Sequence, residues 1–193
     1  MAVSAKLKAL LDGAKVKYKV MTHPVVYTAQ EIAAAQHIPG RQLAKCVLVK
    51  TDRGPTLAVL PAVHRIDFKK LKSVLGVKSV SIANEEHIKA QFPDVEVGAM
   101  SPFGNLYSVP VVVDRDLGQT EEIVFNAGSH TDTIKMRYQD FAGLVKPKTG
   151  AFGQPFPGPK PAKTKKAASS KRKTARAKTK ASTRAKKKTK SRR

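Results

Sequence analysis

The sequence predicts an α/β fold: a single domain with a mixed, curved, barrel-like sheet flanked by helices, plus a disordered basic C-terminal tail. Three observations lead to this prediction. Hairpin-like pairs of apolar segments are mixed with helical crossovers, which is typical of a mixed sheet. The region before the tail is about 150 residues long, enough to bury a core without disulfide bonds. From residue 162 onward only Ala, Lys, Arg, Ser and Thr occur, which is too little apolar surface to offset the entropy of folding.

Five helices are predicted from apolar spacing and capping residues. The leucines within residues 7–11 recur at helical spacing with lysines on the opposite face. Thr28-Ala29-Gln30-Glu31 has the spacing of a capping box, in which the two polar side chains satisfy free N–H groups at the start of a helix. Asp67 and Asn84 are N-cap residues, and Gly76 ends the helix that Asp67 begins. The expected helices are 4–12, 29 to about 36, 68–75, 85–92 and 138–144.

Eight strands are predicted from apolar runs. Residues 45–50 are apolar on both faces, and the turn at 52–55 connects this run to the next one. A polar loop bracketed by glycines at 98–104 and a turn at 114–118 separate the later runs. The expected strands are 18–21, 45–50, 56–61, 77–82, 95–97, 109–113, 121–126 and 131–136.

Charge and proline content divide the chain into three segments. The formal net charge is +23, and residues 160–193 contain 17 Lys or Arg and no acidic residue. Five prolines between residues 147 and 161 indicate an extended linker. We therefore predict a domain over 1–147, a Pro/Gly-rich linker over 148–161 and a disordered Lys/Arg/Ala-rich tail over 162–193.

Composition argues against several classes of protein. The single cysteine, Cys46, cannot form an internal disulfide framework, and the N-terminus lacks the apolar core of a signal peptide. No apolar run approaches the roughly 18 residues of a membrane span, so we expect a cytoplasmic protein with no membrane partner. The five histidines show no metal-ligand spacing and the sequence has no glycine-rich phosphate-binding motif, so we expect no metal and no cofactor.

Lys45 is the first residue with a chemical role to consider. The two-residue period of a strand places Lys45, Val47 and Val49 on one face, so the lysine begins an otherwise apolar row. One interpretation is an edge residue whose stem packs on apolar surface while its charge stays in water. The other is a site residue at the mouth of the core.

The loop from Gly98 to Gly104 is the second candidate. Gly98 permits backbone angles closed to other residues, and Pro102 biases Ser101 towards extended angles. Free N–H groups and one hydroxyl in a fixed array suit a carbonyl or an oxyanion. The alternative interpretation is a plain turn between two strands.

Ser129 and His130 are adjacent in the sequence, which raises the hypothesis of a serine nucleophile and a histidine general base. Neighbouring residues on a strand point to opposite faces, and no Gly-x-Ser-x-Gly elbow is present. A Ser-His-Asp triad is therefore disfavoured. Cys46 is interpreted as a small buried apolar residue rather than a reactive thiol.

Taken together, four ordered motifs resemble the YbaK/prolyl-tRNA-synthetase-associated editing domain family of aminoacyl-tRNA deacylases. The resemblance covers about residues 3–147. It implies a mixed, barrel-like sheet and hydrolysis of the ester that joins a wrong amino acid to tRNA, by a positioned water without a metal or covalent nucleophile. The motifs are His23-Pro24 with Thr28-Ala29-x-Glu31, Leu43-Ala44-Lys45, Gly98-x-x-Ser101-Pro102-x-Gly104 and Asn126-Ala127-Gly128-Ser129-His130.

The resemblance also assigns roles to residues. It implies that Lys45 is the essential lysine and that the Gly98–Pro102 loop binds the substrate, and we expect Gly98 and Ser101 to act with Lys45 in catalysis. On physical grounds, the backbone N–H groups from Gly98 to Met100 are the candidates for stabilising the oxyanion. The residue after the lysine varies in the family, so the amino acid that is removed stays open. The implied substrate-binding residues are His23, Tyr27, Thr28, Cys46, Met100, Pro102, Phe103, Ser129 and His130.

The implied partner is an aminoacyl-tRNA, and an aminoacyl-tRNA synthetase is a second partner left open. Seventeen uncompensated charges favour non-specific binding of RNA or DNA by the tail over a merely solubilising role. An alternative function is a nucleic-acid-binding protein with a histone-like tail and an inactive deacylase-like pocket. The tail residues expected to contact nucleic acid are Lys163, Lys165, Lys166, Lys171, Arg172, Lys173, Lys186, Lys187 and Lys188.

Overall fold

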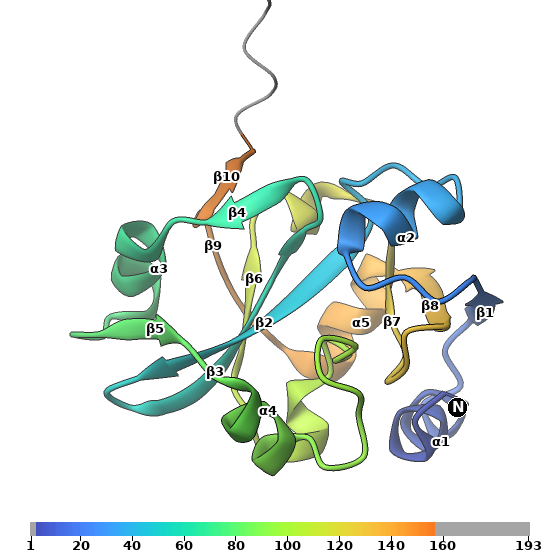
Figure 1. The fold of residues 1–193 in the computed structure, drawn as a ribbon, viewed down its shortest axis with the longest axis horizontal. Helices are drawn as coiled ribbons and strands as arrows, with labels where there is room; N and C mark the ends of the chain where they lie inside the picture. The colour runs from blue at the N-terminus through green and yellow to red at the C-terminus, as the bar shows by residue number, and fades with distance from the viewer. Residues whose placement is uncertain (1–2, 157–193) are drawn as a thin grey trace, which may run out of the picture. The chain divides into compact units, whose positions relative to one another are not determined.

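Three β-sheets and five α-helices organise residues 3–156, which are the part of the chain that the computed structural model describes (Figure 1). The predicted tail at 162–193 lies outside these residues. Parallel and antiparallel pairs occur in the same sheet, which confirms the mixed α/β fold. Within residues 3–156 no helix is long and apolar enough to cross a bilayer.

A five-stranded sheet with the order β5-β2-β3-β6-β9 forms the centre of the domain. The long hairpin β2–β3 comes from the two apolar runs around the turn at 52–55, with Lys45 paired with Leu60. β3 pairs with β6 and β6 with β9 in parallel. The strands are β2 (Ala44–Thr51), β3 (Gly54–Pro61), β5 (Val80–Ile82), β6 (Val111–Asp114) and β9 (Lys148–Gly150).

A second, antiparallel sheet has the order β1-β8-β7, with β1 (Tyr18–Thr22), β8 (Asp132–Arg137) and β7 (Glu122–Asn126). A single parallel bridge between Leu43 and Val124 joins it to the start of β2. The Val124 N–H donates to the Gln42 carbonyl at 2.9 Å at this junction. The two sheets are therefore joined at one point, and they do not close into a barrel.

The helices begin at the predicted capping residues. The Thr28 hydroxyl accepts from the Glu31 N–H, and the Glu31 carboxylate accepts from the Thr28 N–H, so the capping box is present. Asp67 and Asn84 are N-caps whose side chains accept hydrogen bonds from backbone N–H groups of the first turn, and Gly76, with a φ of 68°, ends the helix that Asp67 begins. The helices are α1 (Ala5–Gly13), α2 (Ala29–Ala35), α3 (Phe68–Leu75), α4 (Glu85–Gln91) and α5 (Tyr138–Val145).

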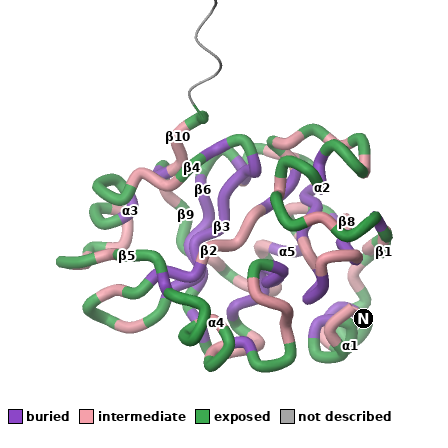
Figure 2. Tube along the Cα trace, in the orientation of Figure 1, coloured by how far each residue is buried: buried purple, intermediate pink, exposed green. Residues whose placement is uncertain are grey.

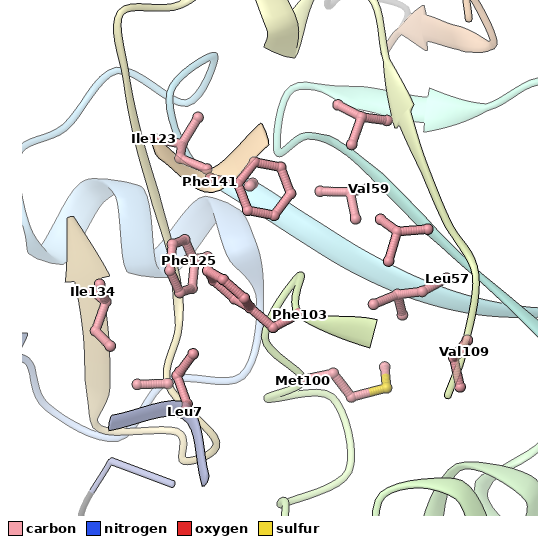
Figure 3. Packing of buried hydrophobic residues seen from close by; sticks show 14 of the residues in the cluster. Leu7, Leu57, Val59, Met100, Phe103, Val109, Ile123, Phe125, Ile134 and Phe141 are labelled. Carbon is pink, nitrogen blue, oxygen red and sulfur yellow. The ribbon is translucent and has the colours of Figure 1, made fainter. Parts of the chain in front are cut away.

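The main core lies between the two sheets and is closed by α1 and α5. Buried residues concentrate along the central strands, whereas α3 and α4 present mostly exposed residues (Figure 2). Phe103 lies at the centre of this core, with ring centroids 5.6 Å from Phe125 and 5.4 Å from Phe141 (Figure 3). Leu7 of α1 and Met100 belong to the same cluster.

Two sequence predictions about secondary structure are wrong. The expected strand at 95–97 is a loop, because the Val95 N–H donates to the Phe92 carbonyl and the Glu96 N–H to the Gly128 carbonyl. The expected linker forms strands at its start: β9, already described, and β10 (Gly153–Pro155), which pairs with β4 (His64–Ile66). Phe152 between them is fully buried, so the folded region extends beyond residue 147.

Candidate active site

A pocket of about 160 Å³ opens where α2, the start of β2, the Gly98 loop and the end of β7 meet. It is smaller than the roughly 300–1,000 Å³ of typical pockets for drug-sized ligands. Most of the lining residues have apolar side chains, with one ammonium and one amide among them, and backbone groups contribute further polar surface. The lining residues are Tyr27, Ala29, Ile32, Leu43, Ala44, Lys45, Cys46, Gly98, Met100 and Asn126.

Lys45 reaches the pocket from β2 and is half-buried. Burial lowers the pKa of its ammonium, because a charged group is less well solvated there. Its Nζ lies 4.8 Å from the centroid of the Phe156 ring, and no carboxylate within residues 3–156 forms an ion pair with it. The ammonium is thus placed to hold an oxygen of a bound molecule.

Gly98 has a φ of 91°, so this position requires the glycine that the sequence predicted to matter. Its carbonyl lies 3.5 Å from Asn126 Nδ2, which fastens the loop to the end of β7. The Ala99 N–H donates to the Glu96 carbonyl at 2.9 Å, which removes it from the predicted set of oxyanion donors. In the described part of the chain, the N–H groups of Gly98 and Met100 have no hydrogen-bond partner.

The rest of this loop turns away from the pocket. Met100 lines the pocket, but Ser101, Pro102 and Phe103 are buried and are not part of its wall. The Phe103 ring packs against Phe125 in the core (Figure 3). Its large apolar side chain gains more from the core than from a pocket mouth, which explains why the structure does not bring it to the site.

His130 holds the segment that leads into the Gly98 loop. Its Nε2 lies 3.0 Å from the Val97 carbonyl, so Nε2 carries the proton, and its backbone N–H donates to the Glu96 carboxylate at 2.8 Å. The His130 ring meets the exposed ring of Tyr27 edge-on, with centroids 4.9 Å apart. Tyr27, His130 and Gly98 are therefore neighbours, but only Tyr27 and Gly98 of the three line the pocket.

Ser129 does not act with His130 as a nucleophile and base would. The Ser129 hydroxyl donates to the Asp132 carboxylate at 2.7 Å, and the Thr131 hydroxyl donates to the same carboxylate at 2.8 Å. Because the His130 imidazole is engaged by Val97, these residues form a loop-stabilising network rather than a triad.

Of the remaining predicted residues, Cys46 lines the pocket, whereas His23 and Thr28 lie outside its wall. Cys46 lines the pocket, and burial raises the pKa of its thiol, so the thiol is neutral near pH 7. His23 is buried, with its N–H bound to the Thr131 carbonyl and its Nδ1 2.8 Å from the Pro24 carbonyl. Thr28 caps α2. Neither His23 nor Thr28 lines the pocket.

Asn126 is the functional candidate that sequence reasoning did not select. Its Oδ1 is buried without a hydrogen-bond partner in the described residues, and its side chain lines the pocket. A polar side chain at the end of an apolar strand, two residues before a glycine, was the available signal. The other lining residues missed were Ala29, Ile32, Leu43 and Ala44, whose apolar side chains carry no such signal.

A separate polar cluster lies outside the pocket. His64 Nδ1 lies 3.7 Å from Asp114 Oδ1 and 3.8 Å from Asp116 Oδ2, a grouping that could hold a metal ion. The Asp114 carboxylate also accepts from the N–H groups of Phe152 and Gly153. It thus ties β10 to the end of β6, and none of the three lines the pocket.

Comparison with known proteins shows the family to which the chain belongs. The model of the family described as "Aminoacyl-tRNA editing domain" matches residues 23–144. The prolyl-tRNA editing protein ProX of Acetoanaerobium sticklandii is 27% identical over 150 residues, which cover 75% of this chain and 91% of that protein. A proline–tRNA ligase of Xanthomonas oryzae pv. oryzae is 30% identical over 130 residues, which cover 66% of this chain but only 23% of the ligase.

A solved structure shares the fold. It is described as a proposed trans-editing enzyme for prolyl-tRNA synthetase, and it superimposes with a TM-score of 0.69 over 79% of this chain and 99% of its own. The sequence identity of that pair is 18%, so the likeness is one of fold.

Proposed function

We propose, because the chain belongs to the aminoacyl-tRNA editing domain family, that it hydrolyses the ester bond between a wrong amino acid and its tRNA. The proposed place of action is the cytoplasm, where charged tRNA is used in translation. One observation supports the proposal: Lys45, Gly98 and Met100 line the same pocket, and the N–H groups of Gly98 and Met100 have no hydrogen-bond partner among residues 3–156.

These groups match the needs of ester hydrolysis. An aminoacyl ester is already activated, so orienting a water molecule and stabilising the developing oxyanion are sufficient catalysis. The two N–H groups are the proposed oxyanion donors. The Lys45 ammonium is proposed to hold the ester carbonyl or the terminal ribose. Cys46 is kept neutral by burial, which favours a positioned water over a covalent thiol nucleophile.

The proposed substrate is a proline tRNA that carries a small, non-cognate amino acid. The relative from Acetoanaerobium sticklandii is named for prolyl-tRNA editing, and the pocket volume of about 160 Å³ suits a small side chain. Action in trans, on tRNA released by a synthetase, is part of this proposal, since the similarity to the relative named for prolyl-tRNA editing covers 75% of this chain.

A panel of mischarged tRNAs tests this proposal. The full chain is expected to release small non-cognate amino acids from proline tRNA and to leave correctly charged prolyl-tRNA intact. Release is measured from radiolabelled aminoacyl-tRNA, with the rate of spontaneous hydrolysis subtracted. Tight tRNA binding without hydrolysis of any member of the panel would instead favour the alternative of a binding protein with an inactive pocket.

The basic tail is proposed to add nucleic-acid affinity without taking part in the chemistry. Deleting residues 160–193 should weaken binding of both tRNA and duplex DNA at low salt and flatten the salt dependence. A protein that makes 6–10 phosphate contacts loses about 10³–10⁵ in affinity between 50 and 200 mM salt. Binding is measured at several salt concentrations, alongside hydrolysis at saturating tRNA, which should persist. An unchanged salt slope would remove the tail from binding.

A further inference from the structure

The Lys45 ammonium contacts the ring of Phe156, a residue that lies after the region matched by the family model. The family match ends at residue 144, whereas Phe156 lies after β10. The Phe156 ring lies 4.8 Å from Lys45 Nζ and remains 44% exposed. A cation over the face of an aromatic ring is attracted by the ring's quadrupole within about 6 Å of the centroid.

The backbone that carries Phe156 is held at several points. Its N–H donates to the Val63 carbonyl at 3.0 Å. The preceding strand β10 pairs with β4 in antiparallel register, with Pro155 opposite His64. Further back, the Asp114 carboxylate accepts from the Phe152 N–H at 2.9 Å, and the Phe152 side chain is fully buried. The ring therefore sits on an anchored segment.

Lys45 has no other partner for its charge in the described residues: neither an ion pair nor a hydrogen bond involves its Nζ. A lysine side chain has four rotatable bonds and carries about 2 kcal/mol of rotamer entropy. Without a partner, the ammonium would spend much of its time in solvent rather than at the pocket.

We propose that Phe156 is a positioning residue for Lys45 and holds its ammonium at the mouth of the pocket. The role in hydrolysis rests on the proposed function, but the contact itself does not. A residue of the segment that follows the matched editing domain thus completes the site.

Kinetics of Phe156 variants test the positioning role in the full chain. Phe156→Leu keeps an apolar side chain but removes the ring face, and it should lower kcat/KM for ester hydrolysis by about 3- to 10-fold. Phe156→Tyr and Phe156→Trp keep the ring face and should stay within about 2-fold of the wild type. Phe68→Leu is the matched control, since Phe68 is 38% exposed on α3 and does not line the pocket.

Two kinetic results would overturn the positioning role. One is an activity of Phe156→Leu equal to that of the wild type. The other is an equal loss in Phe156→Leu and Phe156→Trp, which would indicate packing rather than the ring face. Melting temperatures of all variants identify any loss that arises from unfolding.

An NMR measurement tests the contact independently of activity. Lysines are reductively methylated with ¹³C, which preserves their charge, and the Lys45 signal is identified by its absence in Lys45→Arg. The ring should shift the Lys45 signal upfield in the wild type and in Phe156→Tyr, and the shift should vanish in Phe156→Leu. A Lys45 signal that Phe156→Leu leaves unmoved would refute the contact. A shifted signal in a protein that hydrolyses no tested ester would refute the proposed function and leave the contact established.

Discussion

Lys45→Ala should reduce the rate of ester hydrolysis by at least about 100-fold, the loss typical of removing one transition-state donor, with little change in melting temperature. The ammonium is half-buried at the pocket and pairs with no carboxylate of the described residues, so no ion pair is lost on its removal. Burial disfavours its charge, as the lowered pKa indicates, so its loss also relieves a cost of folding. Hydrolysis and thermal unfolding are measured on the same samples.

Lys50→Ala is the matched control for this prediction. Lys50 belongs to the same strand, but it is exposed and its Nζ lies 2.9 Å from His87 Nε2, away from the pocket. Its loss should leave hydrolysis within about 2-fold, as expected for a surface side chain. Wild-type activity in folded Lys45→Ala would remove Lys45 from the mechanism, and an equal loss in both variants would point to general electrostatic attraction of tRNA.

Local signals in the sequence were sufficient for most of the fold. The capping box at Thr28 and the N-cap at Asp67 work through residues two to three positions apart, so they can be read from short stretches. The β2–β3 hairpin likewise follows from two apolar runs and the turn between them. The three-residue strand β10 gives no periodic signal, and its Pro/Gly-rich sequence matches a linker.

What the sequence could not show depends on contacts between distant residues. Phe152 is buried because the Asp114 carboxylate, 38 residues earlier, binds the backbone there. Phe103 belongs to the predicted site loop, yet its ring enters the core beside Phe141, which depends on the space left by α5. The Lys45–Phe156 contact joins residues on β2 and after β10, which no short-range pattern connects.

The two predicted parts of the site reached the pocket for different reasons. The position of Lys45 at the end of an apolar row left two interpretations open, and the family motif selected it; it lines the pocket from β2. Gly98 was selected for its backbone freedom, and the observed φ of 91° uses that freedom. Ser101 was selected as the one hydroxyl of the loop and through its motif, but the loop carries it into the interior.

Gly98→Val should lower hydrolysis by at least about 10-fold while the affinity for uncharged tRNA stays within about 2-fold, because the loop's N–H groups are proposed to stabilise the oxyanion rather than to bind the tRNA body. A Cβ at this position would lie 3.5 Å from His130 Cε1, and the branched side chain would extend further into the space beside the ring. The positive φ also disfavours valine. The loop should therefore shift and move the Gly98 and Met100 N–H groups away from the proposed position of the oxyanion.

Gly54→Val separates this local effect from general strain. Gly54 has a φ of 108° at the β2–β3 turn, and a Cβ there would meet no atom within 4 Å. The variant should lose stability through backbone strain of about 1–2 kcal/mol and yet retain hydrolysis when it is folded. Rates and tRNA affinities are measured for both variants below their melting temperatures. Equal losses of hydrolysis in the two variants, or an equal loss of hydrolysis and tRNA affinity in Gly98→Val, would contradict a specific role of the Gly98 loop in the reaction.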